Sequence, residues 1–262
     1  MKCGVFDSGI GGLSVAGELL KARLFREIVY FGDTARVPYG NRNESTIIRY
    51  SLEALEFLKN FDIDFLVVAC NSASAWALEE LKKEANFPVV GVIEAGVEGV
   101  KKLPPTAPIL LTGTRATIKS QIYQRELKRE GYSNLIALPT PLFVPFVEEG
   151  LWKGSLIEAV FAHYFHHLNR EKVEGVILGC THYPFLSPIF QKFFPNATLI
   201  HSGKSIVEYL RRHFHFSPAP STSFQIYASE NVAEVRQKAL HWLTSMGVKI
   251  TLETGGIFTS GR

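Results

Sequence analysis

Two cysteines of this 262-residue chain, Cys70 and Cys180, each end an apolar run and each precede small or hydrogen-bonding residues. The first lies in "VVACNSAS" (67–74) and the second in "VILGCTHYP" (176–184). An unperturbed thiol has a pKa of ~8.5, so it can accept or release a proton near neutrality. Two thiols on opposite sides of one carbon atom could remove a proton from one face and return it to the other. Such a pair would invert a stereocentre without a cofactor.

The ordinary explanation for a cysteine in an apolar run is a small core side chain. Cys3 fits that explanation, because its neighbours are apolar and no polar partner lies beside it. Cys70 and Cys180 differ, since Asn71–Ser72 follows the first and Thr181–His182 follows the second. Both cysteines precede predicted helices, whose positive N-terminal ends stabilise a thiolate. We therefore interpret these two thiols as chemical groups.

The residues around the two thiols suit an anionic ligand. Helix N-termini and the side chains of Ser8, Asn71, Ser72 and Thr181 offer hydrogen-bond donors to carboxylates without any arginine. The "DSGIGG" segment (7–12) resembles a dinucleotide-binding loop, but its spacing is wrong. We expect its glycines to permit a close approach of the backbone.

Asp7, Glu148 and His182 are candidates to assist the thiols. Each also has an ordinary explanation: the aspartate as a helix N-cap, the glutamate as a surface acid and the histidine as a packed side chain. All three lie near the predicted ends of strands, in one inferred cleft. That shared location favours a role in the site.

Apolar runs alternate with segments of helical periodicity along most of the chain. This alternation predicts parallel sheets covered by helices on both faces. We expect a strand and turn over 3–9, and further strands over 27–33, 64–70, 88–94, 109–114, 134–139 and 175–180. We expect helices over 11–25, 45–61, 72–85, 117–130 and 155–168.

The pattern restarts after "KKLPPTAP" (101–108), which holds three prolines in eight residues. "VPY" at Val37 returns as "VPF" at Val144, an offset of 107, and the two strand-end cysteines differ by 110. We infer two copies of one α/β unit. Ligands of parallel sheets bind beyond the carboxyl ends of the strands. The residues expected at such ends, which would line one cleft if the copies face each other, are Asp7, Asp33, Cys70, Thr112 to Thr114, Glu148 and Cys180.

Composition argues against several classes of protein. A net charge of +3, spread evenly, does not indicate a nucleic-acid partner. No apolar stretch approaches the ~20 residues of a membrane span, and the N-terminus lacks a signal-peptide core. Three cysteines are too few for a disulfide framework. We expect a reduced, cytoplasmic protein with free thiols and no membrane association.

At these residues the chain resembles the glutamate racemases, within the cofactor-independent aspartate/glutamate racemase superfamily. The resemblance rests on six segments in order: "GVFDSGIGGLSV", "DTARVPYG", "VVACNSASA", "GVIEAG", "TPLFVPFVEEG" and "GCTHYP". It implies two pseudo-symmetric, doubly wound α/β domains with mainly parallel sheets and an active site between them. The first domain would be discontinuous, over 1–93 plus 205–262, and the second would span 94–204.

The resemblance also implies the roles of individual residues. Cys70 and Cys180 would be the two bases that interconvert L- and D-glutamate, and the product would supply peptidoglycan biosynthesis. Asp7, Glu148 and His182 would assist catalysis, with Asp7 near Cys70 and the other two near Cys180. The positions that would bind substrate are Asp7, Ser8, Tyr39, Gly40, Asn71, Ser72, Thr181 and His182. The resemblance implies that the enzyme needs no cofactor and no metal. It also implies a homodimer.

Three departures from the family pattern stand out. Ser72 occupies a position where threonine is usual, and Ala95 one where proline is usual. The tail after Ser245 has no counterpart that we can place, although 248–253 is expected to form a strand.

Other functions remain open on the sequence alone. The closest alternative is a sibling such as an aspartate racemase. A thiol hydrolase would pair Cys180 with His182, which are only two residues apart at a strand end, and a lone nucleophile would leave Cys70 unexplained. A non-catalytic binding protein for a dicarboxylate amino acid, or a zinc site formed by Cys70, Cys180 and His182, are the remaining candidates.

Overall fold

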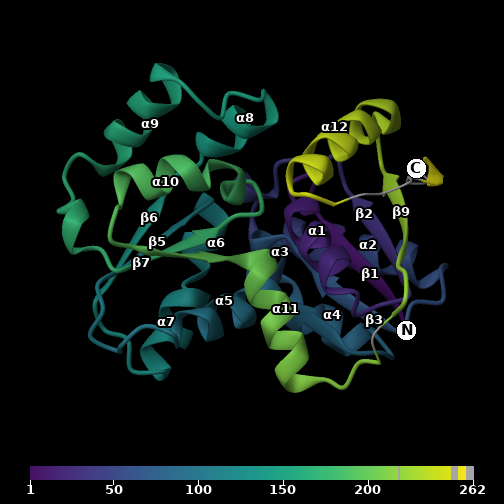
Figure 1. Cartoon of the computed structure of the whole chain (residues 1–262). Coiled ribbons are helices and arrows are strands. Elements are labelled where there is room, and N and C mark those ends of the chain that lie inside the picture. The colour runs from purple at the N-terminus through teal and green to yellow at the C-terminus, as the bar shows by residue number, and fades with distance from the viewer. Residues whose placement is uncertain (218, 249–252, 258–262) are drawn as a thin grey trace.

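The computed structural model describes residues 1–217, 219–248 and 253–257, and it divides into two lobes (Figure 1). The first lobe contains a six-stranded sheet in the order β10-β9-β2-β1-β3-β4. The second contains a four-stranded sheet in the order β6-β5-β7-β8. Every described strand pair is parallel.

The strands of the first sheet are β1 (Lys2–Asp7), β2 (Glu27–Gly32), β3 (Phe65–Val68), β4 (Val89–Gly91), β9 (Ser223–Ala228) and β10 (Glu253–Ile257). Those of the second are β5 (Ile109–Gly113), β6 (Leu135–Pro139), β7 (Gly175–Gly179) and β8 (Thr198–His201). The helices are α1 (Leu13–Ala22), α2 (Glu44–Lys59), α3 (Asn71–Trp76), α4 (Leu78–Glu84), α5 (Val92–Val100), α6 (Arg115–Ser120), α7 (Ile122–Arg129), α8 (Phe143–Glu148), α9 (Ser155–Phe165), α10 (Ser187–Phe193), α11 (Ser202–His213) and α12 (Val232–Ser245). Three short 3-10 helices are η1 (Tyr39–Asn41), η2 (Arg170–Lys172) and η3 (Tyr183–Leu186).

The two sheets share one strand order. The order β2-β1-β3-β4 of the first lobe corresponds to β6-β5-β7-β8 of the second. In such sheets the crevice lies where the order reverses, here beside β1 and β3 and beside β5 and β7. The predicted fold class, two doubly wound α/β units, is confirmed.

Helices cover both faces of the first sheet, because alternate strand residues face opposite ways. Val5 and Val67 belong to the apolar cluster that includes α1, α11 and α12. Phe6 and Val68 belong to the cluster that includes α2, α3 and α4. All four residues of β3 and all five of β7 are buried, as expected of strands covered on both sides.

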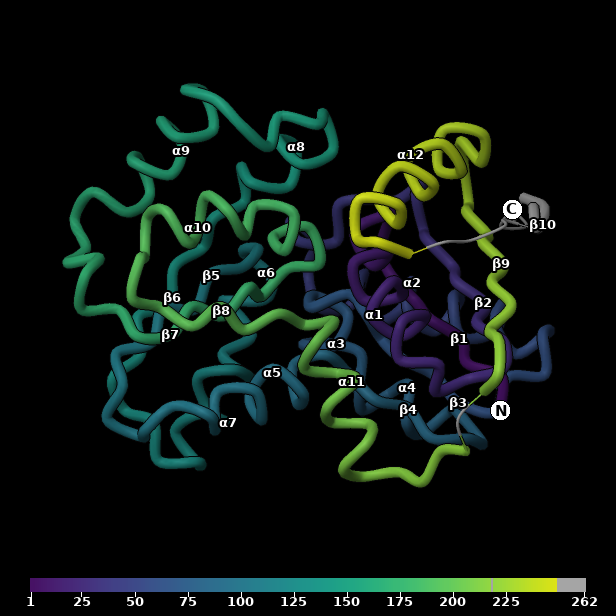
Figure 2. The backbone as a smooth tube through the Cα atoms, viewed as in Figure 1, coloured from purple at the N-terminus to yellow at the C-terminus, as the bar shows by residue number. Residues whose placement is uncertain are grey.

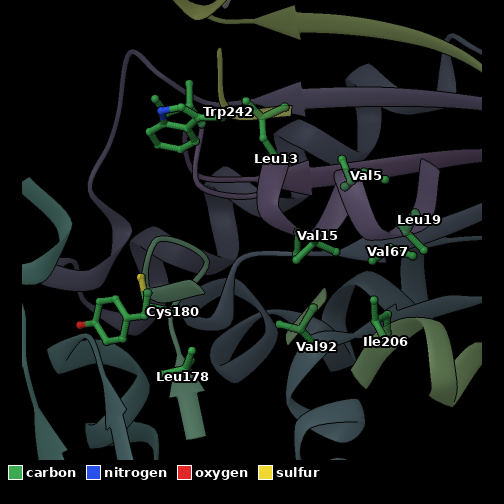
Figure 3. Packing of buried hydrophobic residues seen from close by; sticks show 14 of the residues in the cluster. Val5, Leu13, Val15, Leu19, Val67, Val92, Leu178, Cys180, Ile206 and Trp242 are labelled. Carbon is green, nitrogen blue, oxygen red and sulfur yellow. The ribbon is translucent and has the colours of Figure 1, made fainter. Parts of the chain in front are cut away.

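The first of these clusters crosses from one lobe to the other (Figure 3). Val5 and Val67 of the first sheet share it with Leu178 and Cys180 of the second lobe. Val92 and Ile206 lie between them on α5 and α11. The two lobes therefore share one apolar cluster.

Three expectations about the elements need correction, and a fourth falls mostly outside the described residues. The strand expected over 88–94 stops at Gly91, and α5 begins at Val92, because the apolar letters there suit either structure. The helix expected over 72–85 is divided at Ala77, and the helix expected over 117–130 is divided at Gln121, whose φ of 57° is left-handed. The strand expected over 248–253 falls mostly outside the described residues, since the described part of β10 begins at Glu253.

The end of the chain returns to the first lobe (Figure 2). β9 pairs with β2, with Ser223 opposite Glu27 and Ala228 opposite Gly32. α12 packs on α1 and brings Trp242 to the ring of His182, with 6.2 Å between the ring centroids. Within the parts of the chain that are described, no helix combines the length and the apolar character needed to cross a membrane.

Candidate active site between the two sheets

The two thiols follow equivalent strands. Cys70 comes two residues after β3 and is the N-cap of α3, and Cys180 comes directly after β7. Both are nearly buried, with 5% and 6% of their surface exposed. Both line one cavity with a free volume of about 20 Å³, enough for about one water molecule. The other residues lining it are Ser8, Val37, Pro38, Tyr39, Gly40, Asn71, Ser72, Thr114, Val144, Thr181 and His182.

Ser8 lines the cavity beside Cys70, and Asp7, which precedes Ser8, is buried next to it but is not among the lining residues. The thiol of Cys70 lies 3.5 Å from Ser8 Oγ. Burial and the charge of Asp7 raise the pKa of Cys70 to about 12. Asp7 is itself fully buried, accepts hydrogen bonds from Gly9 N at 3.1 Å and Thr181 Oγ1 at 3.4 Å, and has a pKa raised by burial. Cys70 therefore carries a proton, with a carboxyl group close by.

On the Cys180 side, His182 lines the cavity, and a second carboxylate, that of Glu148, lies behind the histidine and does not line the cavity. Cys180 Sγ lies 3.7 Å from His182 Nδ1, and His182 Nε2 lies 3.0 Å from Glu148 Oε1. Burial lowers the pKa of His182, but the bonds to Cys180 and Glu148 outweigh that effect and raise it to about 10. Burial likewise opposes the ionisation of Glu148, but His182 lowers its pKa. Cys180 and His182 are therefore in contact, although only one residue separates them in the sequence.

Two local expectations around this side also differ from the structure. Glu148 is the last residue of α8, the helix that follows β6, rather than a residue at the end of the strand itself. Cys180 is followed by Thr181, His182 and the 3-10 helix η3, so its neighbour is not the start of an α-helix. The histidine, rather than a helix end, supplies the positive charge beside Cys180.

Tyr39 and Gly40 form the first turn of η1 at the edge of the cavity. The hydroxyl of Tyr39 donates to Asp33 Oδ2 at 2.5 Å, and Arg36 Nε donates to the same oxygen at 2.7 Å. Asp33 is fully buried at the end of β2. A Cβ atom at Gly40 would lie 2.6 Å from Thr114 Cβ, so this turn is pressed against the second lobe.

Hydroxyl groups join the lobes beside Ser72. Ser72 Oγ lies 2.9 Å from Thr114 Oγ1, which lies 3.0 Å from Thr117 Oγ1. Sequence reasoning placed Thr114 at a strand end but not among the binding residues, although it lines the cavity. Its position as the N-cap of α6 directly after β5 was the available signal.

Gly11 explains how the two lobes approach so closely at the site. A Cβ atom there would lie 2.4 Å from Thr181 Oγ1 and 2.5 Å from the His182 ring. No other residue type fits at this position without moving the second lobe. The glycines of 7–12 thus serve close approach.

A larger cleft and the possibility of a metal site were the two competing indications of a functional site. A wider cleft of about 640 Å³ opens beside α5, α7 and α11, but neither thiol lines it. Among the described residues, no group of three or more histidine, cysteine, aspartate and glutamate side chains is arranged to hold a metal ion. We therefore identify the site by its paired thiols.

Comparisons with known proteins agree with this arrangement. The family described as Asp/Glu/Hydantoin racemase matches residues 18–210. A glutamate racemase of a Nitratiruptor species is 51% identical over 247 residues, covering 93% of this chain and 96% of that protein. The crystal structure of glutamate racemase from Campylobacter jejuni subsp. jejuni is 47% identical and gives a TM-score of 0.91, covering 93% of this chain and 98% of that one.

A more distant relative was solved in complex with D-glutamate. Glutamate racemase from Francisella tularensis subsp. tularensis, in complex with D-glutamate, is 28% identical and gives a TM-score of 0.84, covering 98% of this chain and 97% of that one. The similarity thus extends over nearly the whole length of each relative. This chain belongs to the Asp/Glu/hydantoin racemase family and, within it, to the glutamate racemases.

Proposed function

We propose that the protein interconverts L-glutamate and D-glutamate, with Cys70 and Cys180 as the two proton-transferring groups. The observation that carries the proposal is the placement of both thiols after equivalent strands, on one shared cavity. The family and the identity of the relatives support glutamate as the substrate. D-glutamate made in this way supplies peptidoglycan biosynthesis.

The protons balance without a cofactor. At neutral pH His182 is positively charged, because its pKa is about 10, and its ring lies 3.7 Å from Cys180 Sγ, where it would offset the charge of the thiolate that the proposed reaction of L-glutamate starts from. Cys70, with a pKa of about 12, holds its proton. When the α C–H bond breaks, its proton moves to the sulfur of Cys180, and the S–H proton of Cys70 forms a new C–H bond on the opposite face.

The two thiols then hold exchanged protonation states, from which the reverse reaction starts. We assign abstraction from L-glutamate to Cys180 and abstraction from D-glutamate to Cys70, as in the family. Asp7 is the proposed proton acceptor beside Cys70. Glu148 is proposed to keep His182 charged beside Cys180.

The substrate is proposed to bind without a lysine or arginine side chain. No lysine or arginine is among the described residues that line the cavity. We propose that hydroxyl, amide and backbone groups bind the two carboxylates and the amino group. These belong to Asp7, Ser8, Tyr39, Gly40, Asn71, Ser72, Thr181 and His182, with Thr114 added from the structure.

The cavity of about 20 Å³ is too small for glutamate. Admission of the substrate therefore requires its walls to separate. The walls that can separate belong to different lobes, since Cys70 and Tyr39 lie on the first and Thr114 and Cys180 on the second.

We further propose the domain division 1–93 plus 205–262 and 94–204, which the pairing of β9 with β2 supports. A cytoplasmic location and a homodimer are likewise proposals. Three exposed leucines near α8 and α9, Leu142, Leu151 and Leu156, are apolar surface that a second copy would cover. Sedimentation equilibrium tests this, and a monomer at micromolar concentration would contradict it.

Heavy-water exchange tests the function. The purified protein should incorporate deuterium at the α-carbon of glutamate without added pyridoxal phosphate. Cys70→Ser and Cys180→Ser should retain residual exchange of opposite enantiomers, because each removes the base for one face. Equal loss of both enantiomers from both variants would contradict the two-sided mechanism.

The same measurements separate the alternatives. Exchange with aspartate and not with glutamate would assign a sibling racemase. The pairing of Cys180 with His182 also suits a thiol hydrolase, but that reaction leaves Cys70 without a role. An acyl-enzyme at Cys180 would favour the hydrolase, and glutamate binding without exchange in the wild type would favour a binding protein.

A further inference from the structure

A buried tyrosine outside the cavity begins a series of hydrogen bonds that runs through Asn71, the residue after Cys70, to Leu178, two residues before Cys180. Tyr123 lies on α7 of the second lobe and is 1% exposed. Its hydroxyl donates to Asn71 Oδ1 at 3.0 Å. Asn71 Nδ2 donates to Ser202 Oγ at 3.4 Å, and Ser202 Oγ donates to the carbonyl of Leu178 at 3.4 Å. The side chains of Tyr123, Asn71 and Ser202 are all buried.

The donors and acceptors in this series of hydrogen bonds can be arranged in one way only. A carbonyl oxygen can only accept, so Ser202 must donate to Leu178 and is left to accept from Asn71. The amide nitrogen of Asn71 therefore faces Ser202, and its oxygen faces Tyr123. If the amide turned over, the buried hydroxyl of Tyr123 would lose the one acceptor that the structure gives it, which is unfavourable.

The absence of a side chain at Gly96 leaves room for the hydroxyl of Tyr123. A Cβ atom at Gly96, on α5, would lie 2.7 Å from the hydroxyl oxygen. The same hydroxyl crosses between lobes, because Asn71 begins α3 of the first lobe. A phenylalanine at position 123 would fill the same volume but could not form this bond.

Two members of this series of hydrogen bonds are close to the thiols in the sequence. Asn71 follows Cys70 directly and lines the cavity. Leu178 lies two residues before Cys180 on β7. The orientation of the Asn71 amide is thus determined by groups that do not line the cavity themselves.

We propose that Tyr123 is a positioning residue for substrate binding, which fixes the polarity of the Asn71 amide through the chain Tyr123–Asn71–Ser202–Leu178. The inference rests on the proposed function, in which Asn71 contacts glutamate. While the chain is intact, the amide presents one fixed face to the cavity. Without the Tyr123 hydroxyl the Asn71 amide can turn, and ordering that amide when glutamate binds weakens binding.

A second buried tyrosine provides the matched control. Tyr132 is 5% exposed and belongs to the same apolar cluster as Tyr123. Its hydroxyl contacts the carbonyls of Val100 and Leu103, at 3.1 and 2.8 Å, and it does not line the cavity. Tyr132→Phe removes one buried hydroxyl from the second lobe, as Tyr123→Phe does.

The experiment measures kcat and KM in both directions, together with Tm, for the wild type, Tyr123→Phe, Ser202→Ala and Tyr132→Phe. Tyr123→Phe should raise KM for both enantiomers by about five-fold, the effect of one net hydrogen bond, and leave kcat within about two-fold. Ser202→Ala should raise KM in the same sense from the other end of the chain. Tyr132→Phe should lower Tm by a similar amount and leave KM unchanged.

Three results would overturn the proposal. An unchanged KM in Tyr123→Phe, with an active wild type, would make Tyr123 a packing residue only. If Tyr123→Phe does not fold, an unchanged KM in Ser202→Ala would count against the chain in the same way. An inactive wild type would instead refute the proposed function, and the role of Tyr123 with it.

Discussion

Replacing Gly11 with alanine should separate the two lobes at the site. The added Cβ atom would lie 2.4 Å from Thr181 Oγ1 and 2.5 Å from the His182 ring, about 1 Å short of van der Waals contact. Neither neighbour is the end of a flexible chain. Thr181 bonds Asp7, and His182 is tied to Cys180 and Glu148. The strain should therefore move the second lobe rather than a single side chain.

The magnitude follows from the tolerance of proton transfer to displacement. A reacting group displaced by about 1 Å loses about a hundred-fold in rate. We expect kcat/KM of Gly11→Ala to fall by about that factor, measured by circular dichroism from either enantiomer. Because L- and D-glutamate have equal free energies in solution, kcat/KM must fall by the same factor in both directions, which checks the measurement internally.

Gly9→Ala is the control for this prediction. Gly9 belongs to the same loop, and a Cβ atom there meets only Val37, at 3.2 Å. That contact requires a shift of a few tenths of an ångström within the first lobe. Gly9→Ala should therefore retain most of the activity. If Gly11→Ala kept kcat/KM within about three-fold of the wild type, the close approach at Gly11 would not set the geometry of the thiols.

Two further predictions concern protonation. In Glu148→Gln, His182 loses one of the two partners that raise its pKa. Because Glu148 is 29% exposed, the pKa of His182 should fall by about one unit. The alkaline limb of the pH profile for L-glutamate racemisation should then move about one pH unit toward neutrality, and an unchanged profile would exclude His182 as the source of that limb. Burial, followed by the charge of Lys204, lowers the pKa of His201 from 6.5 to about 4, so the unfolded chain binds the extra proton between these values and stability is lost as pH falls through that window. His201→Asn should remove about 2 kcal/mol of that acid dependence, seen by comparing urea unfolding at pH 7 and pH 4.5, and an equally steep loss in the variant would assign the dependence to other groups.

The sequence was most informative where chemistry and topology coincide. Cys70 and Cys180 stand out because a buried strand ends beside each of them, and alternation of apolar runs and helices predicted the parallel sheets that bring such ends together. Cys3 has the same side chain within β1, and its burial raises the pKa of its thiol. The difference between these cysteines was visible in their neighbours.

What sequence reasoning missed depends on contacts between segments far apart in the chain. Tyr123 lies in a segment that is amphipathic and otherwise ordinary, and only the folded chain shows its hydroxyl at Asn71. The bend at Gln121 was missed for a related reason, because a left-handed residue other than glycine or asparagine carries no strong local signal. The contact of Cys180 with His182 depends on the backbone between them, which turns instead of continuing the strand.

The return of β9 and α12 to the first lobe has a consequence for the order of synthesis. All four strands of the second sheet precede β9 in the chain, so they leave the ribosome while β2 still forms an open edge of the first sheet. An open edge strand is a template for incorrect pairing, and β2 stays in that condition until Ser223–Ala228 has been made. Trp242 reaches His182 later still. A nascent chain therefore carries both thiols before β9 has covered the edge of the first sheet and before Trp242 has packed against His182.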